Sequence, residues 1–202
     1  MHLSNKQFDQ LICNQTQYLI KYHNDIYDIS EWIPNERLDL HIYPGSFNPL
    51  HDAHKSIYQY MFEQNHYHSN RCLYEISINR HDKPIYSLND INNILDQFSN
   101  HPVLITNQSR FLNKVGTIFD INEQWYPIYY IGIDTFNRLV SDLGIAGISA
   151  LRCRFNVFDR IIENTRYSLN NYSKIPKNCE CIKNALSNDI MRLSSTAIRK
   201  GK

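Results

Sequence analysis

The chain has 202 residues, of which 42% are hydrophobic and 12% aromatic, as is typical of a globular domain rather than a disordered chain. Its 21 basic and 20 acidic residues leave a formal net charge of +1, so the composition gives no indication of a surface for nucleic acid or another polyanion. A phosphate site must therefore be local and must consist of specific residues.

The cysteines and the N-terminal segment indicate a cytoplasmic protein. The cysteines are odd in number and their spacing fits no disulfide framework, so we expect free thiols and, from the lone Cys179-Glu180-Cys181, no zinc site. The first residues lack the apolar core of a signal peptide, and no run reaches membrane-spanning length. We expect neither a membrane nor a nucleic acid as partner, whereas the sequence leaves open a homo-oligomer.

Residues 1–36 are predicted to form an N-terminal helical extension. Ser4 suits the N-cap of a first helix. Apolar residues then recur at roughly helical spacing: Phe8, Leu11, Ile12, Leu19 and Ile20.

Strands and helices are expected to alternate through the remaining domain, residues 37–202. Short apolar runs predict five strands, at 38–43, 72–78, 103–106, 128–132 and 154–158. Helices are expected at 51–64, at 87–98 with Ser87 as N-cap, and from Asp134 onward. This order predicts an α/β fold, a Rossmann-like parallel sheet with helices on both faces, preceded by the short helical extension. Ligands of such sheets bind beyond the carboxyl ends of the strands, where 44–54, 79–83 and 132–134 lie.

The segment from Gly45 to His54 has the features of a phosphate-binding turn. Glycine permits a sharp turn and close approach of the backbone to a ligand. The unpaired N–H groups and the dipole of the helix that follows favour an anion. His51 and His54 are three residues apart, so one helical face carries both imidazoles. Two surface histidines beside an ordinary turn remain the alternative interpretation of this segment.

This segment, Gly-Ser-Phe-Asn-Pro-Leu-His-Asp-Ala-His, resembles the H-x-G-H signature of the nucleotidyltransferase superfamily, with Ala53 where the signature usually has glycine. Its G-S-F-N-P form is especially similar to nicotinamide mononucleotide adenylyltransferases and related cytidylyltransferase-like proteins. A second segment, Leu193 to Arg199, resembles the superfamily signature I-S-S-T-x-I-R and follows in the expected order. Two matches in the correct order are much harder to obtain by chance than one.

Two weaker matches lie between these segments. Gly132 and Asp134 resemble the family's G-x-D, although an aspartate that caps the following helix would have the same sequence. The stretch from Glu75 through Asn79 to Lys83 is similar to an E-L-S-x-x-N-x-D-K-P stretch in one cytidylyltransferase-like branch, to which Lys114 also corresponds loosely.

The resemblance implies a role for each matched residue. His54 would contact the α-phosphate and the charge that develops in the transition state, and His51 would assist. The backbone of the turn would approach the phosphates, through Gly45, Ser46 and Phe47. The β- and γ-phosphates would be held by Ser194, Ser195, Thr196 and Arg199. Gly132 and Asp134 would bind the nucleoside or the acceptor ribose, with Asn79 and Lys83 near the second substrate.

The implied activity is the transfer of AMP from ATP to nicotinamide or nicotinate mononucleotide, with release of pyrophosphate and assistance from Mg²⁺. One alternative is a related transferase that uses CTP or another phosphorylated acceptor. Another is a nucleotide-binding module that has lost catalysis, against which the intact His51, His54 and Arg199 argue. The sequence motifs concern the phosphates, so they do not settle the base or the acceptor.

Overall fold

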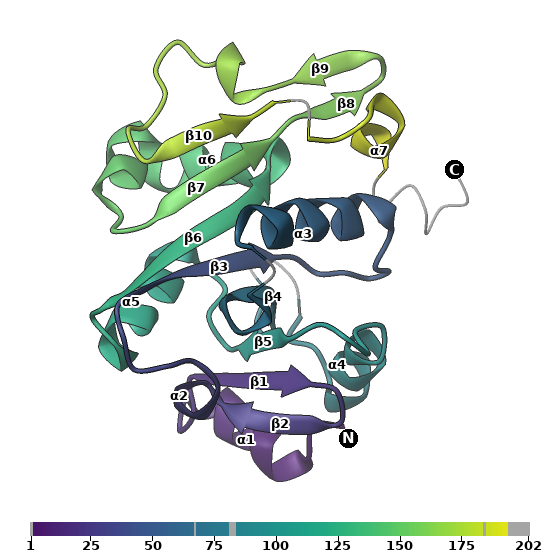
Figure 1. The fold of residues 1–202 in the computed structure, drawn as a ribbon, viewed down its shortest axis with the longest axis vertical. Helices are drawn as coiled ribbons and strands as arrows, with labels where there is room; N and C mark the ends of the chain where they lie inside the picture. Colours follow the sequence, from purple (N-terminus) through teal and green to yellow (C-terminus); the bar gives the residue numbers. More distant parts are fainter. Residues whose placement is uncertain (1, 67, 81–83, 184, 194–202) are drawn as a thin grey trace.

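The computed structural model describes residues 2–66, 68–80, 84–183 and 185–193. Its main feature is an eight-stranded sheet (Figure 1). From one edge to the other, the strands are β10 (Cys179–Ile182), β7 (Arg154–Phe158), β6 (Trp125–Gly132), β3 (Leu38–Pro44), β4 (Cys72–Ser77), β5 (Val103–Thr106), β1 (Tyr18–Tyr22) and β2 (Asp25–Asp28). All pairs from β10 to β5 are parallel, and β1 pairs antiparallel with both β5 and β2.

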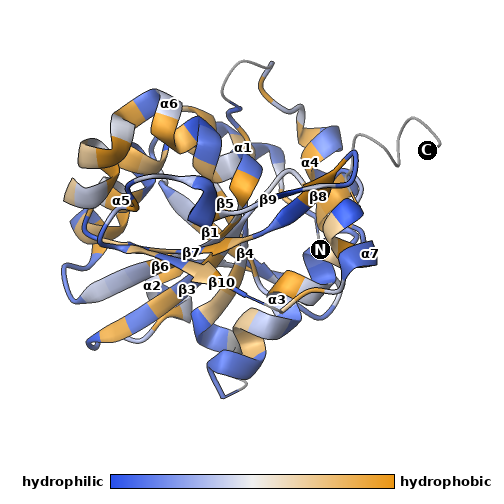
Figure 2. Cartoon of the chain, turned by 90° about the horizontal axis from the view of Figure 1, so that it is seen from above, coloured by the Kyte–Doolittle hydropathy of each residue, from blue (hydrophilic) through white to orange (hydrophobic). Residues whose placement is uncertain are grey.

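The sheet is covered on both faces, and each face has its own apolar core. One core includes side chains from α1 (Asn5–Ile12), α3 (Asp52–Gln64) and α4 (Leu88–Leu95). The other includes side chains from α2 (Ile29–Trp32), α5 (Phe111–Ile121) and α6 (Ile133–Ala150). Figure 2 shows α3 and α6 on opposite sides of the strands. Because both faces of the central strands are buried, their sequences are continuous apolar runs, which confirms the predicted α/β fold class.

The topology reverses at β3. Chain order runs from β3 through β4 to β5 on one side, then returns to β6 on the other side of β3. The carboxyl ends of β3 and β6 therefore bound the position at which doubly wound sheets bind ligands. The loop that begins at Gly45 leaves one of these strands, and Gly132 ends the other.

The N-terminal segment differs from the helical extension expected there. The predicted first helix is present as α1, with the Ser4 hydroxyl accepting from the backbone N–H of Gln7 at 3.3 Å. The residues that follow, however, form the hairpin β1–β2 and extend the main sheet. Leu19 and Ile20 pack into opposite cores, as neighbouring residues of a strand do, although their spacing from Leu11 also fits a helix.

The five strands expected in the main domain are all present within a few residues of their predicted bounds, and Ser87 caps α4 as expected. Five further elements were not predicted: α5, β10, α7 (Asn188–Arg192), and the two strands of a hairpin, β8 (Arg160–Ile162) and β9 (Thr165–Tyr167). Among the described residues, no helix combines the length and the apolar character needed to cross a membrane.

Candidate active site

The loop after β3 is anchored on both sides. The backbone N–H of Gly45 donates to the carbonyl oxygen of Glu75 in β4 at 3.0 Å. The ring of Phe47 folds back so closely that a Cβ on Gly45 would lie 2.6 Å from it, which explains the need for glycine here. Phe47 itself is fully buried among the rings of Tyr43, Tyr74 and Phe98. Its side chain therefore holds the loop in place, whereas Ser46 beside it is exposed.

The two predicted histidines lie side by side at the start of α3. His51 is the N-cap residue, and its backbone N–H donates to Nδ1 of His54 at 3.3 Å. The two rings are stacked, with centroids 3.7 Å apart. Because Nδ1 of His54 accepts this bond, the proton of the neutral imidazole must be on Nε2. His54 thus has a defined tautomer whose Nε2 is a hydrogen-bond donor.

Both imidazoles are neutral near pH 7. Burial, together with the neighbouring His51, lowers the pKa of His54 to about 3. Burial and the charge of Arg160 also lower the pKa of His51, against the opposing effect of Asp52. The site therefore offers neutral N–H donors from α3, and its fixed positive charge comes from Arg160.

Arg160 is a site residue that the sequence analysis did not identify. It lies just beyond the carboxyl end of β7 and forms an ion pair with Asp134 in the first turn of α6. Its Nε atom is buried and has no hydrogen-bond partner among the described residues. A lone arginine after a strand carries no motif, so only the fold brings it close enough to Asp134 and His51 to affect them.

Some of the predicted site residues lie close together in the structure, and others do not. Gly132 is the N-cap residue of α6, so Asp134 lies next to the end of β6, as predicted. Asn79 follows β4, and its carbonyl oxygen accepts from the Ser77 hydroxyl at 2.5 Å. No hydrogen bond between described residues links Asn79 to the histidines. The predicted residues Lys83, Ser194, Ser195, Thr196 and Arg199 lie outside the described residues. The last described helix, α7, contacts both α3 and β8.

Lys114, which corresponds only loosely to the cytidylyltransferase-like branch, forms a buried ion pair. It lies in α5, and its Nζ is 2.6 Å from the Glu75 carboxylate, with both side chains buried. Burial raises the pKa of Glu75, and the charge of Lys114 opposes this shift. The backbone carbonyl of Glu75 is the group that anchors Gly45. The pair thus stabilises β4, the strand to which the loop is hydrogen-bonded.

Neither a family model nor a curated protein sequence matches this chain, but solved structures do. One is Plasmodium falciparum nicotinic acid mononucleotide adenylyltransferase complexed with NaAD, with a TM-score of 0.58 and 21% identity, covering 80% of this chain and 82% of that chain. A second is the same Plasmodium falciparum protein complexed with APC, with a TM-score of 0.55, 20% identity and the same coverage. At these identities the likeness concerns the fold, and it agrees with the Rossmann-like architecture described above.

Proposed function

We propose that this protein transfers the adenylyl group of ATP to nicotinate or nicotinamide mononucleotide, forming a dinucleotide and pyrophosphate. The observation that supports it most is the stacked His51–His54 pair at the start of α3, beside Arg160 and Asp134 at the next strand ends. The likeness to a nicotinic acid mononucleotide adenylyltransferase over 80% of the chain supports the same activity.

The triphosphate would bind across the carboxyl ends of β3 and β6. The first N–H groups of α3 have no partner within the helix and attract an anion. The Nε2 proton of His54 would donate to an oxygen of the α-phosphate. In this proposal Ser194, Ser195, Thr196 and Arg199 hold the β- and γ-phosphates from the chain that follows α7.

The reaction makes one P–O bond and breaks another. A phosphate oxygen of the mononucleotide attacks the α-phosphorus, and the bond from that phosphorus to the β-phosphate oxygen breaks, releasing pyrophosphate. The attacking oxygen is already anionic at neutral pH, so no general base is required. The protein must align two anions and stabilise the charge on the leaving group. A neutral imidazole donor and a fixed guanidinium are suited to these two tasks.

Mg²⁺ enters this proposal together with ATP. Mg²⁺ binds through phosphate oxygens and one or two carboxylates, and it would neutralise charge on the phosphates. Asp134 is a carboxylate at the end of β6 that fits this requirement, whereas Asp159 at the end of β7 is buried and paired with Arg166. In the described structure Asp134 pairs with Arg160, so the nucleotide would bind beside an ion pair whose two members can each contact it.

The candidate residues for binding the acceptor, Asn79 and Lys83, follow β4 in the sequence. Asn79 follows β4, which lies on the side of β3 away from β6, and this leaves the switch point free for ATP. We propose that these residues face the mononucleotide. Their roles rest on sequence similarity and on the position of β4 in the sheet.

Incubation of the purified protein with Mg²⁺, ATP or CTP, and a panel of phosphorylated acceptors tests the proposal, with products identified by mass spectrometry. We expect a dinucleotide from ATP with nicotinate or nicotinamide mononucleotide. Product from CTP, or only from another acceptor, would favour a related transferase. Binding of ATP without any product would favour a nucleotide-binding module.

Replacement of Arg199 by alanine tests the second phosphate-binding segment. We expect the KM for ATP to rise about 10–100-fold, because one charge-assisted contact to the triphosphate is lost. Arg192→Ala, which removes an exposed arginine from the end of α7, is the matched control and should leave KM unchanged. An unchanged KM in Arg199→Ala would exclude this residue from the phosphate site.

A further inference from the structure

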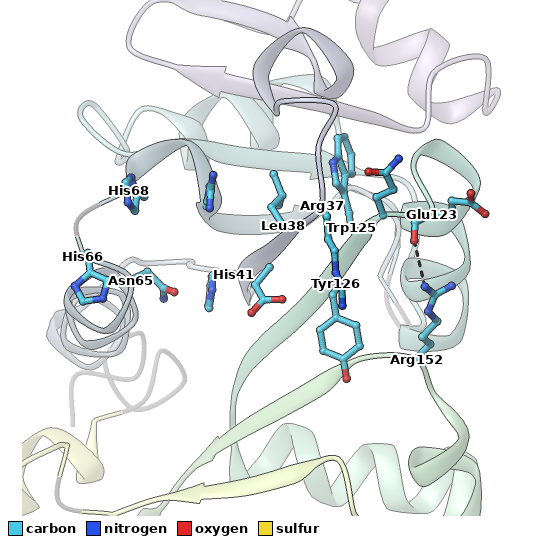
Figure 3. A pocket seen from close by; sticks show the side chains of 13 residues that line it. Arg37, Leu38, His41, Asn65, His66, His68, Glu123, Trp125, Tyr126 and Arg152 are labelled. Atoms are coloured by element: carbon cyan, nitrogen blue, oxygen red, sulfur yellow. Dashed lines mark hydrogen bonds between the residues drawn. The ribbon is translucent and has the colours of Figure 1, made fainter.

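A large cavity lies at the amino ends of the central strands, the end of the sheet opposite the candidate active site (Figure 3). Its volume is about 1130 Å³. Its lining comes from the first residues of β3 and β6 and from the segments that precede β4 and β7. Catalysis in this fold occurs at the carboxyl ends of the strands, so this cavity at their amino ends is separate from the candidate active site.

Three arginines from three different connections line this cavity. Arg37 precedes β3, Arg71 ends the short helix before β4, and Arg152 precedes β7. The lining also includes two carboxylates, those of Asp39 and Glu123, which are exposed to solvent. Neither carboxylate forms an ion pair with any of the three arginines. Among the lining residues the arginines outnumber the carboxylates by one, and Arg71 is itself paired with Glu36, which lies outside the lining.

Most of the guanidinium donors are not used within the described structure. Arg37 donates no hydrogen bond to a described residue. Arg71 donates from Nη2 to Glu36 at 2.9 Å, but its Nε is buried without a described partner. Arg152 donates from Nη2 to the backbone carbonyl of Glu123 at 3.2 Å. Because a guanidinium has five N–H donors, each side chain retains donors for a ligand.

Three histidines, His41, His66 and His68, also line this cavity. Figure 3 shows His41 between His66 and His68 on one side and Arg152 on the other. Nδ1 of His41 is 3.1 Å from the Tyr130 hydroxyl, and its Nε2 has no hydrogen bond to a described residue. Burial lowers the pKa of His41 to about 4, and the charges that add to this effect are those of Arg154 and Arg71. His41 thus adds to the lining a ring nitrogen without a hydrogen-bond partner among the described residues.

From these features we propose that the cavity binds a phosphorylated anion of nucleotide size. Guanidinium groups supplied by three separate connections suit the tetrahedral oxygens of phosphates better than a single planar carboxylate. A volume of about 1130 Å³ lies just above the usual range of small-ligand sites, about 300–1,000 Å³, so the cavity has room for a ligand of nucleotide size. The ring nitrogens of His41, His66 and His68 add further hydrogen-bonding groups to the lining.

Binding of inorganic tripolyphosphate, measured by titration calorimetry on the full chain, tests this site. We expect a binding event that Arg37→Ala and Arg152→Ala each weaken about 10–100-fold, because each removes charge-assisted hydrogen bonds. Both arginines are exposed, so both variants should fold, which circular dichroism checks. Lys6→Ala removes an equal charge from the exposed surface of α1 and should bind like the wild type.

Two results would overturn the proposal. One is unchanged affinity and stoichiometry in both arginine variants, since any tripolyphosphate bound at the catalytic loop does not depend on Arg37 or Arg152. The other is an equal loss in Lys6→Ala, which would indicate non-specific attraction. Adenylyl transfer should be the same in all three variants. If the protein transfers no adenylyl group at all, the titration still decides whether this cavity binds phosphate.

Discussion

The backbone N–H of His51 donates to Nδ1 of His54 at 3.3 Å, and the two rings stack with centroids 3.7 Å apart. This contact has a chemical consequence beyond the capping of α3. It fixes the tautomer of His54, so that Nε2 carries the proton and remains the donor that faces a ligand. The low pKa of this partly buried imidazole keeps it neutral, so the proposed catalyst is a hydrogen-bond donor rather than an imidazolium.

Replacement of His54 by alanine should lower kcat about 10²–10³-fold, the usual loss for one donor to a transition state. The fold should persist, because the ring is only partly buried. Steady-state assays of pyrophosphate release measure this effect. His23→Ala, which removes an exposed histidine from the β1–β2 turn, is the control. Turnover near that of the wild type in His54→Ala would exclude the proposed role.

Arg160 should contribute to the binding of the nucleotide. Its replacement by alanine removes the charge beside His51 and leaves Asp134 without its partner. We expect kcat/KM for ATP to fall about 10–100-fold, the range of one or two charge-assisted hydrogen bonds. Arg138→Ala removes an exposed arginine from the same helix as Asp134 and should have little effect. Equal kinetics in the two variants would contradict the placement of Arg160 in the site.

His41 should make the stability of the protein depend on pH. Burial, with Arg154 and Arg71, lowers its pKa from 6.5 to about 4. In the unfolded chain it takes up a proton near pH 6.5, whereas the folded protein resists protonation down to about pH 4. Its contribution is therefore present above pH 6.5 and is lost as the pH falls, by up to about 1.4 kcal/mol per pH unit.

Urea unfolding between pH 7 and pH 5 measures this slope. His41→Gln lacks the titrating group, so its free energy of unfolding should fall less steeply with decreasing pH than that of the wild type. His54 has the same sign of shift and contributes to both proteins equally. Parallel pH dependences in the wild type and His41→Gln would disprove the assignment.

The buried pair of Glu75 and Lys114 should behave as a unit. Lys114→Met leaves the Glu75 carboxylate buried without its partner, which should cost about 3–5 kcal/mol of unfolding free energy. Adding Glu75→Gln removes the charge and should recover most of this loss. Urea unfolding of the two single variants and the double variant gives the coupling energy. Additive losses would show that the two side chains do not interact.

The sequence predicted the central fold because the deciding signals are local. The five strands of the main domain are apolar runs that end at turns, and Ser87 marks a helix start by its side-chain chemistry. The hairpin β1–β2 was not predicted, because Leu19 and Ile20 fit both a helix and a doubly buried strand. Only pairing with β5, distant in the sequence, decides between these structures.

In the candidate site, too, residues with a local sequence signal were predicted, and residues whose position depends on the fold were not. His51, His54 and Asp134 were found because they follow strands within recognisable motifs. Arg160 was not, because its proximity to Asp134 depends on the neighbouring positions of β6 and β7 in the sheet. The environment of Lys114 also could not be inferred, because its partner comes from another strand and the helix α5 had not been predicted.

ATP labelled at a single phosphorus provides the most direct test of the proposed activity. The protein is incubated with Mg²⁺, nicotinate or nicotinamide mononucleotide, and ATP labelled at either the α- or the γ-phosphorus, and the products are separated. We predict that the α-label appears in the dinucleotide and the γ-label in pyrophosphate, in equal amounts. Retention of the α-label in ADP, with the γ-label in free phosphate, would contradict cleavage at the α-phosphorus and with it the proposed function.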